Sequence, residues 1–304
     1  MKAKSSFRLV FFGTPEYVLP IFKALHKEYG WRGKRAIAVV TRPPKKADKT
    51  GFITHSPVDN WAYKRDLPVI YRPGDAPEAD LGILAAYGKI IPKETIEKFK
   101  YGILNIHPSL LPKYRGASPV QGAIANGDKF TGVTVIKIDE ELDHGPIVSS
   151  FKEKILPDET AEELKARLFE RSTEFVTALI PNYLAGKVNI KPQDHKFATF
   201  TKILKREDGF IEAATLSHAM KGVGSEKIYN LYRAMHPWPG IWTKVQTQIP
   251  NNKRQIPKRL KILKAHLSPD TDHRTLVTDC VQLEGKSPVS WEEFKKGYPG
   301  ATLD

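Results

Sequence analysis

The sequence predicts an α/β fold with a doubly wound, mostly parallel sheet, followed by a smaller β-rich domain. Two observations support this prediction. In the first half, short apolar runs alternate with segments of helical periodicity, which is typical of a parallel sheet covered by helices. In the last third, several short strand-like runs follow one helical segment, so we expect a second core there.

The first half supplies the elements of the larger domain. Its apolar runs have the length of buried strands and lie at residues 7–12, 36–40, 81–86 and 103–107. Amphipathic stretches between them predict helices near residues 16–29, 57–65 and 92–99. Two further strands are expected at residues 131–139 and 146–155, joined by the acidic connection EELDHG. A long helix within residues 158–186 opens with a capping pattern made by Asp158, Thr160, Glu162 and Glu163.

The second half begins with a segment that lacks clear periodicity. We expect this segment, residues 187–200, to be a linker between a domain at residues 1–186 and a domain at residues 201–304. Beyond the linker the pattern predicts a helix at residues 214–234. The strand-like runs of the smaller domain lie at residues 241–248, 259–267 and 275–285.

The charge of the chain indicates a polyanionic partner. The formal net charge is +14 over 304 residues, which favours nucleic acid or an acidic membrane surface over a small metabolite. No apolar run approaches the roughly 18 residues of a membrane span, and MKAKSS passes directly into the strand-like FRLVFF without a signal peptide. We therefore expect a soluble, cytoplasmic protein without a membrane partner.

An amide and an imidazole lie at the end of one predicted strand. Asn105 and His107 are two residues apart in LNIH, so both side chains project from one face of the strand. Ligands of open α/β sheets bind beyond the carboxyl ends of the strands. There an amide N–H can stabilise a developing oxyanion, and an imidazole can accept a proton from an attacking amine. The pair suits acyl transfer.

A third partner is needed to orient the histidine. Asp143, in the acidic connection, is the best placed carboxylate, but Asp139, Glu140 and Glu141 compete with it on sequence grounds. A purely structural interpretation makes His107 a core histidine with its hydrogen bonds satisfied, Asn105 a turn residue and Asp143 a cap. The sequence has no Cys or His cluster with the spacing of a metal site, so we expect no metal.

Basic residues gather in two runs. The first run follows the second predicted strand, at the edge of the sheet where the candidate active site lies. The second run lies in the smaller domain. The candidate phosphate-binding residues are Arg42, Lys45, Lys46 and Lys49 in the first run and Lys253, Arg254, Lys258 and Arg259 in the second. In a chain of this charge, the two runs predict contacts with the phosphates of a nucleic acid.

The stretch NIHPSLLPKYRGASPVQGAI, followed by TGVTVIKIDEELDHGPIV, resembles the signature of the methionyl-tRNA formyltransferase family. FFGTPEY, TRPPKK, AAYGKIIP and HPWPGIW also occur in the family's order. The resemblance covers nearly the whole chain. It implies that the catalytic set is Asn105, His107 and Asp143. It further implies that the folate is held by Ser109, Leu110, Leu111 and Pro112, together with Tyr87 and Gly88.

The resemblance implies a Rossmann-like formyltransferase domain and an OB-like C-terminal domain that binds tRNA. The implied reaction transfers the formyl group of 10-formyltetrahydrofolate to methionyl initiator tRNA, and we expect the enzyme to be a monomer. Two departures from the family are visible. The first basic loop reads PPKKADKTGFITHSP in place of a glycine-rich stretch, and the C-terminal domain is abbreviated.

Two alternatives stay open. A folate-dependent N-formyltransferase that acts on an amino-sugar nucleotide would share the catalytic set but would not need the basic runs. A non-catalytic RNA-binding protein on the same scaffold would keep the basic runs but would not need the catalytic set.

Overall fold

The computed structural model describes residues 7–30, 37–46, 52–248, 255–270, 274–299 and 301, and it divides into two compact units. The first unit comprises Met1–Pro119, Phe130–Lys154 and Lys165–Thr201. The second comprises Val120–Lys129, Ile155–Leu164 and Lys202–Asp304. The predicted boundaries at residues 186 and 201 stay a prediction. Within the described residues, no helix is long and apolar enough to cross a membrane.

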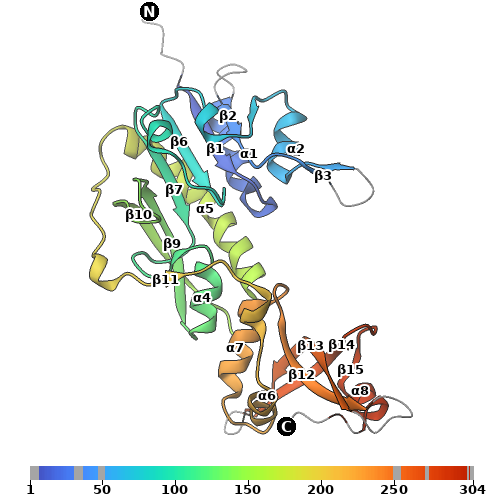
Figure 1. Ribbon diagram of the computed structural model, residues 1–304. Coiled ribbons are helices and arrows are strands. Elements are labelled where there is room, and N and C mark those ends of the chain that lie inside the picture. The colour runs from blue at the N-terminus through green and yellow to red at the C-terminus, as the bar shows by residue number, and fades with distance from the viewer. Residues whose placement is uncertain are drawn as a thin grey trace, which may run out of the picture. The chain divides into compact units, whose positions relative to one another are not determined.

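Seven strands of the first unit form one sheet (Figure 1). These strands are β1 (Leu9–Gly13), β2 (Ile37–Val40), β5 (Val69–Ile70), β6 (Leu81–Ala85), β7 (Ile103–His107), β9 (Phe130–Lys137) and β10 (Ile147–Lys154). Their order is β10-β9-β7-β6-β1-β2-β5. Strands β7, β6, β1, β2 and β5 run parallel, whereas β9 is antiparallel to both β7 and β10. The predicted mostly parallel sheet is confirmed.

Both faces of this sheet carry core packing. Phe11 and Phe12 are neighbours on β1, so they point to opposite faces. Phe11 stacks on Phe22 of helix α1 (Leu19–Tyr29) at 4.8 Å between ring centroids. Phe12 contacts Tyr87 and Phe99 edge-on at 5.9 and 5.8 Å. The apolar run of β1 is therefore buried on both sides, as expected for a central strand of a doubly wound sheet.

The chain before β9 also contains several short helices and strands. They are η1 (Glu16–Val18), β3 (Lys45–Lys46), β4 (Ile53–Thr54), α2 (Pro57–Tyr63), η3 (Pro73–Asp75), α3 (Lys93–Ile96), β8 (Arg115–Gly116) and α4 (Pro119–Ala125). The long helix α5 (Ala161–Leu184) begins behind the predicted cap. There the main-chain N–H of Thr160 donates to Glu163 at 2.8 Å, and the Thr160 hydroxyl accepts from the N–H of Glu163 at 3.4 Å. The Thr160 hydroxyl also donates to the Glu163 carboxylate at 2.7 Å, and this bond together with the one from the Thr160 N–H holds the pKa of Glu163 below its usual value.

The second unit contains a small antiparallel sheet, which confirms the predicted β-rich domain. Its order is β12-β13-β14-β15, made of Ile241–Gln248, Gln255–Leu267, Leu276–Leu283 and Val289–Ser290. The other elements are η5 (Arg206–Gly209), α6 (Ala213–Met220), α7 (Ser225–Met235) and α8 (Trp291–Gly297). The single helix predicted at residues 214–234 is wrong, because Gly222 and Gly224 adopt positive φ angles of 98° and 72° and divide it.

The segment predicted as a linker makes many main-chain contacts within the first unit. Lys191 exchanges two main-chain hydrogen bonds with Ile147 of β10, at 2.7 and 2.9 Å. A 3-10 turn, η4 (His195–Phe197), leads to β11 (Phe200–Thr201), which pairs in parallel with β8. The segment lies beside the loop that follows β7, and this position bears on the active site.

A buried arginine of α7 should stabilise the second unit. Arg233 is 6% exposed and donates to the carbonyl oxygens of Leu156 and Glu159 at 3.1 and 2.9 Å. We expect Arg233→Leu to lower the free energy of unfolding by about 2–4 kcal/mol, because both carbonyls lose a charged donor. Urea unfolding followed by circular dichroism would measure the loss. Lys227→Leu, on the exposed surface of the same helix, is the matched control, and equal stability of the two variants would contradict this account.

Candidate active site

The carboxyl end of β7 presents an amide and an imidazole in a buried position. Asn105 pairs with Ile136 and His107 pairs with Thr134 of the antiparallel neighbour β9. The two side chains share one face of the strand, as predicted. Their residues are 7% and 4% exposed. Because both side chains are buried at the carboxyl end of a central strand, each of their polar atoms needs a hydrogen-bond partner in the protein or in a bound molecule.

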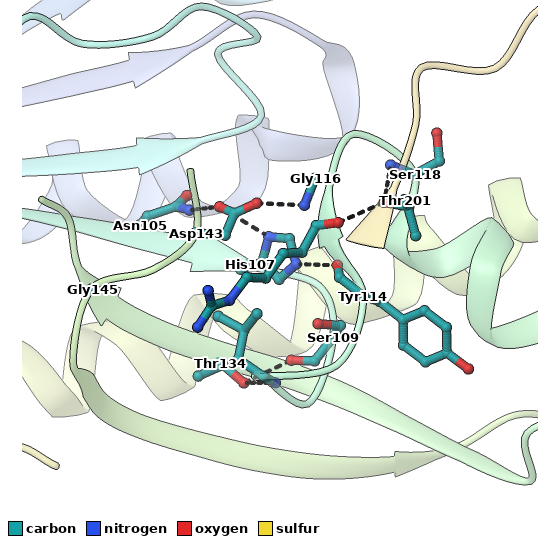
Figure 2. Close-up of polar contacts among 12 residues, drawn as sticks. Asn105, His107, Ser109, Tyr114, Gly116, Ser118, Thr134, Asp143, Gly145 and Thr201 are labelled. Atoms are coloured by element: carbon teal, nitrogen blue, oxygen red, sulfur yellow. Dashed lines mark hydrogen bonds and ion pairs between the residues drawn. The ribbon is translucent and has the colours of Figure 1, made fainter. Parts of the chain in front are cut away.

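Asp143 supplies that partner. Figure 2 shows its carboxylate between Asn105, His107 and Gly116. Oδ1 accepts from Asn105 Nδ2 at 3.1 Å, and Oδ2 accepts from the main-chain N–H of Gly116 at 2.8 Å. His107 Nδ1 lies 3.5 Å from Oδ1. Asp143 has a φ of 50°, in the left-handed region that residues with a Cβ rarely adopt.

The other acidic candidates have different partners. Asp139 binds His144 Nδ1 at 2.7 Å, Glu140 pairs with Lys93 at 2.6 Å, and Glu141 lies 3.9 Å from His144 Nε2. Of the four carboxylates in this connection, Asp143 is the one that the structure brings to Asn105 and His107.

A main-chain carbonyl fixes the orientation of the histidine ring. His107 Nε2 lies 2.9 Å from the carbonyl oxygen of Tyr114. Because a carbonyl oxygen only accepts, Nε2 must carry the proton of this bond. Nδ1 is therefore the nitrogen that faces Asp143, and it can donate to the carboxylate only when the ring is protonated.

The SLLP segment is fixed to β9 through Thr134. The Thr134 hydroxyl donates to the carbonyl of Ser109 at 2.7 Å and accepts from the N–H of Leu111 at 3.0 Å. Ser109 itself donates to the carbonyl of Lys113 at 2.7 Å. Ser109 and Leu111 are buried, while Leu110 and Pro112 are half-buried. The segment is thus a fixed wall beside His107.

Tyr87 and Gly88 lie just beyond β6. Tyr87 is fully buried, and its hydroxyl has no hydrogen-bond partner among the described residues. Burial raises the pKa of the Tyr87 phenol, opposed by the charge of Arg42. A side chain so enclosed leaves only the main chain of residue 87 for contact with a ligand. The Gly88 carbonyl accepts from Arg42 Nη2 at 3.3 Å.

Basic side chains surround a pocket of about 320 Å³ at the same sheet edge. The pocket is lined by Arg42, Pro43, Pro44, Lys45, Gly88 and Lys89. The structure thus brings the predicted Arg42 and Lys45 together with a cation that sequence reasoning missed, Lys89. The signal that could have found Lys89 is its place directly after a strand whose carboxyl end shares this edge.

The other predicted basic residues lie elsewhere. Lys46 belongs to β3, beside Lys45. Lys258 and Arg259 belong to β13 of the second unit, where Arg259 lies 3.4 Å from Glu284 and 5.9 Å above the ring of Trp242. Lys49, Lys253 and Arg254 lie outside the described residues.

Four polar residues near the site were not predicted. They are Arg115, Gln193, Thr199 and Thr201. Gln193, Thr199 and Thr201 each bond to the loops that carry Asp143 or follow His107, and Arg115, within the latter loop, bonds to Gln193. Gln193 and Thr199 belong to the predicted linker at residues 187–200, whose lack of periodicity gave no signal of a role, and Thr201 follows it. Among the described residues, no three His, Cys, Asp or Glu side chains gather as they would around a metal ion.

The fold and the site define an α/β enzyme of the group-transfer class. Residues 7–180 match the family model described as formyl transferase, and residues 223–277 match the model of the formyl transferase C-terminal domain. The chain therefore belongs to the formyl transferase family.

Relatives named methionyl-tRNA formyltransferase are similar over most of the chain. The one from Thermotoga neapolitana is 37% identical over 243 residues, covering 77% of this chain and 74% of the relative. The one from Roseiflexus castenholzii is 32% identical over 319 residues, covering 96% of each chain.

Two solved structures share the fold at low sequence identity. The methionyl-tRNA formyltransferase of Clostridium thermocellum aligns with a TM-score of 0.55 at 20% identity, over 91% of this chain and 98% of that one. An N-formyltransferase of Helicobacter canadensis, solved with folinic acid and dTDP-3-aminofucose, aligns with a TM-score of 0.66 at 18% identity, over 90% and 98%.

The amide of Asn105 offers a direct test of the site. An amide nitrogen has two N–H donors, so one can hold Asp143 while the other stabilises an oxyanion. We expect Asn105→Ala to lower kcat for formyl transfer by about 10²–10³, with a thermal midpoint close to that of the unchanged protein. Steady-state kinetics and calorimetry would measure both. Asn182→Ala, an exposed amide of α5, serves as control, and full turnover in Asn105→Ala would refute the oxyanion role.

Proposed function

We propose that this protein transfers the formyl group of 10-formyltetrahydrofolate to the α-amino group of methionyl initiator tRNA, for translation initiation. The observation that carries the proposal is the buried network of Asn105, His107 and Asp143 at the carboxyl edge of the sheet. Relatives named methionyl-tRNA formyltransferase, 32–37% identical to this chain, support the choice of acceptor.

In this mechanism 10-formyltetrahydrofolate supplies the electrophilic formyl carbon. Asn105 donates its second amide N–H to the formyl oxygen as negative charge develops there. His107 and Asp143 accept the proton that the attacking amine loses as the new C–N bond forms, and they return a proton to the folate nitrogen as its bond to the formyl carbon breaks. The amine attacks in its uncharged form. Its nitrogen becomes positively charged as the C–N bond forms, so the site must accept a proton from it.

The residues that we propose to hold the folate fit a flat heterocycle with several donors and acceptors. Ser109, Leu110, Leu111 and Pro112 form a wall that Thr134 fixes at two points, and Tyr87 and Gly88 offer main-chain groups beyond β6. Aliphatic side chains and main-chain groups are the usual lining of such sites. The proposal assigns no metal to the reaction.

The proposed tRNA contacts are Arg42, Lys45, Lys46 and Lys49 in the first domain and Lys253, Arg254, Lys258 and Arg259 in the second. The pocket of Arg42, Lys45 and Lys89 supports phosphate binding, because its three cations lie at the edge where β7 also ends. We further propose that residues 1–186 form the catalytic domain, that residues 201–304 form the tRNA-binding domain, and that the enzyme acts as a cytoplasmic monomer.

A transfer assay tests the proposal directly. Purified protein and 10-formyltetrahydrofolate would be supplied in parallel with charged initiator tRNA, free methionine or an amino-sugar nucleotide, at two salt concentrations. We expect formylation of the tRNA alone, with an affinity that falls steeply as salt rises, because phosphate contacts release counterions. Formylation of the sugar nucleotide would establish the alternative acceptor. RNA binding without transfer to any acceptor would leave a non-catalytic RNA-binding protein.

The cations of the basic pocket should contribute to tRNA binding and not to the chemical step. We expect Lys89→Ala and Lys45→Ala each to raise KM for the tRNA several-fold at unchanged kcat. Each should also reduce the slope of log affinity against log salt by about 0.7–0.9, the value for one lost phosphate contact. Lys100→Ala is the control, because exposed Lys100 precedes β7 and so lies at the opposite edge of the sheet. An unchanged salt slope in both pocket variants would exclude phosphate contacts there.

A further inference from the structure

The segment at residues 191–201 lies along both loops of the active site. Beyond the main-chain pairing of Lys191 with Ile147, its polar side chains reach inward at three positions. Gln193 contacts the connection that carries Asp143, while Thr199 and Thr201 contact the loop that follows His107. A segment with only a tethering role would not need buried polar contacts, yet Gln193 is 5% exposed.

Arg115 fixes the orientation of the Gln193 amide. Gln193 Oε1 accepts from Arg115 Nε at 3.2 Å and from Nη2 at 2.7 Å. A guanidinium has donors only, so the amide atom that faces it must be the oxygen. The Gln193 nitrogen is therefore directed to the other side. His195 Nδ1, 2.8 Å from Arg115 Nη2, must likewise be the acceptor.

On that other side, Gln193 Nε2 donates to two main-chain carbonyls, those of Asp143 at 2.9 Å and Gly145 at 2.8 Å. The two carbonyls flank His144, so one amide group holds the whole turn. The turn is also close to β9, because a Cβ on Gly145 would lie 1.9 Å from the carbonyl oxygen of Lys137. With φ at 50°, Asp143 needs such support from outside its own loop.

Thr199 fixes the opposite side of the site. Its hydroxyl accepts from the N–H of Tyr114 at 2.8 Å, and its carbonyl accepts from the N–H of Arg115 at 2.8 Å. Tyr114 has a φ of 61°, and its carbonyl is the group that contacts His107 Nε2. Thr199 thus orients the acceptor that orients the imidazole.

We propose that Gln193 is a positioning residue for Asp143, and Thr199 for His107, so that the segment at residues 191–201 is part of the catalytic machinery. Gln193 acts through the Asp143 turn, with Arg115 as the anchor that directs its amide. For its kinetic readout this inference rests on the proposed formyl transfer. It also has a readout that needs no substrate.

Gln193→Glu separates anchoring from positioning. A carboxylate still accepts from Arg115, as an ion pair, but it cannot donate to the carbonyls of Asp143 and Gly145. We expect kcat for formylation of methionyl-tRNA to fall about 10–100-fold with the KM of both substrates unchanged, at a temperature well below the thermal midpoint, which the carboxylate facing two carbonyl oxygens should lower. Asn189→Ala removes an exposed amide two residues before the segment and is the matched control. Full kcat in Gln193→Glu would overturn the proposal.

Hydrogen exchange tests the same inference without any substrate. The N–H of Gly116 donates to Asp143 Oδ2, so its protection reports where the carboxylate lies. In Gln193→Glu we expect this amide to exchange at least tenfold faster. The N–H of Arg115, which donates to the carbonyl of Thr199, should stay protected. If both amides keep their protection, Gln193 does not position Asp143, whether or not the protein transfers formyl groups.

Thr199 gives an independent pair of variants. Thr199→Val removes the hydroxyl that accepts from Tyr114 and keeps the shape of the side chain, and we expect a tenfold or larger loss of kcat at unchanged KM. Thr199→Ser restores the hydroxyl and should restore kcat. Equal kcat in the valine and serine variants would overturn the role of Thr199. If the protein without substitutions transfers no formyl group, the proposed function is wrong. The hydrogen-exchange experiment on Gln193→Glu then decides the inference.

Discussion

The carboxylate of Asp143, whose side chain is 9% exposed, is the constraint on which the site depends. A charge so enclosed is stable only where donors surround it, and its donors come from separate parts of the chain. Asn105 and His107 belong to β7, and Gly116 belongs to β8 beyond the following loop. Satisfying one charge therefore fixes the end of a central strand, the loop beyond it and the β9–β10 connection in a single arrangement.

Much of this arrangement follows from local sequence patterns. The parallel strands are apolar runs because both faces of the sheet are covered. Asn105 and His107 are two residues apart in one strand, which places both side chains on one face. Asp143 was different. Spacing left four carboxylates open, and the resemblance to a known family, not the pattern, singled out Asp143. In the second unit, Gly222 and Gly224 show why helical periodicity failed there, since apolar spacing persists across a break that backbone conformation imposes.

Gln193 and Thr199 could not be predicted from the sequence, for a physical reason. Helices and strands bond to their neighbours in a repeating register, and that repeat is what a pattern detects. The predicted linker, residues 187–200, instead bonds to β8, to β10 and to two loops, each through only one or two residues. Such contacts leave no period in the sequence. They become visible only when the sheet has brought distant segments together, which is why the segment was predicted as a plain linker.

At the carboxyl ends of the strands, the residues around Asp143 and those of the basic pocket are different sets. This separation bears on how one scaffold could serve different formyl acceptors. The fold alone does not choose among them, since a sugar N-formyltransferase and a methionyl-tRNA formyltransferase both share it with this chain. In the proposed function, the network around Asp143 serves the formyl oxygen and the transferred proton, which are common to every acceptor. Arg42, Lys45 and Lys89 lie apart from that network, around the ends of β2 and β6. If these cations bind the acceptor as proposed, substitutions among them would affect acceptor binding without removing a donor from Asp143, so the proposed chemistry and acceptor binding rest on different residues.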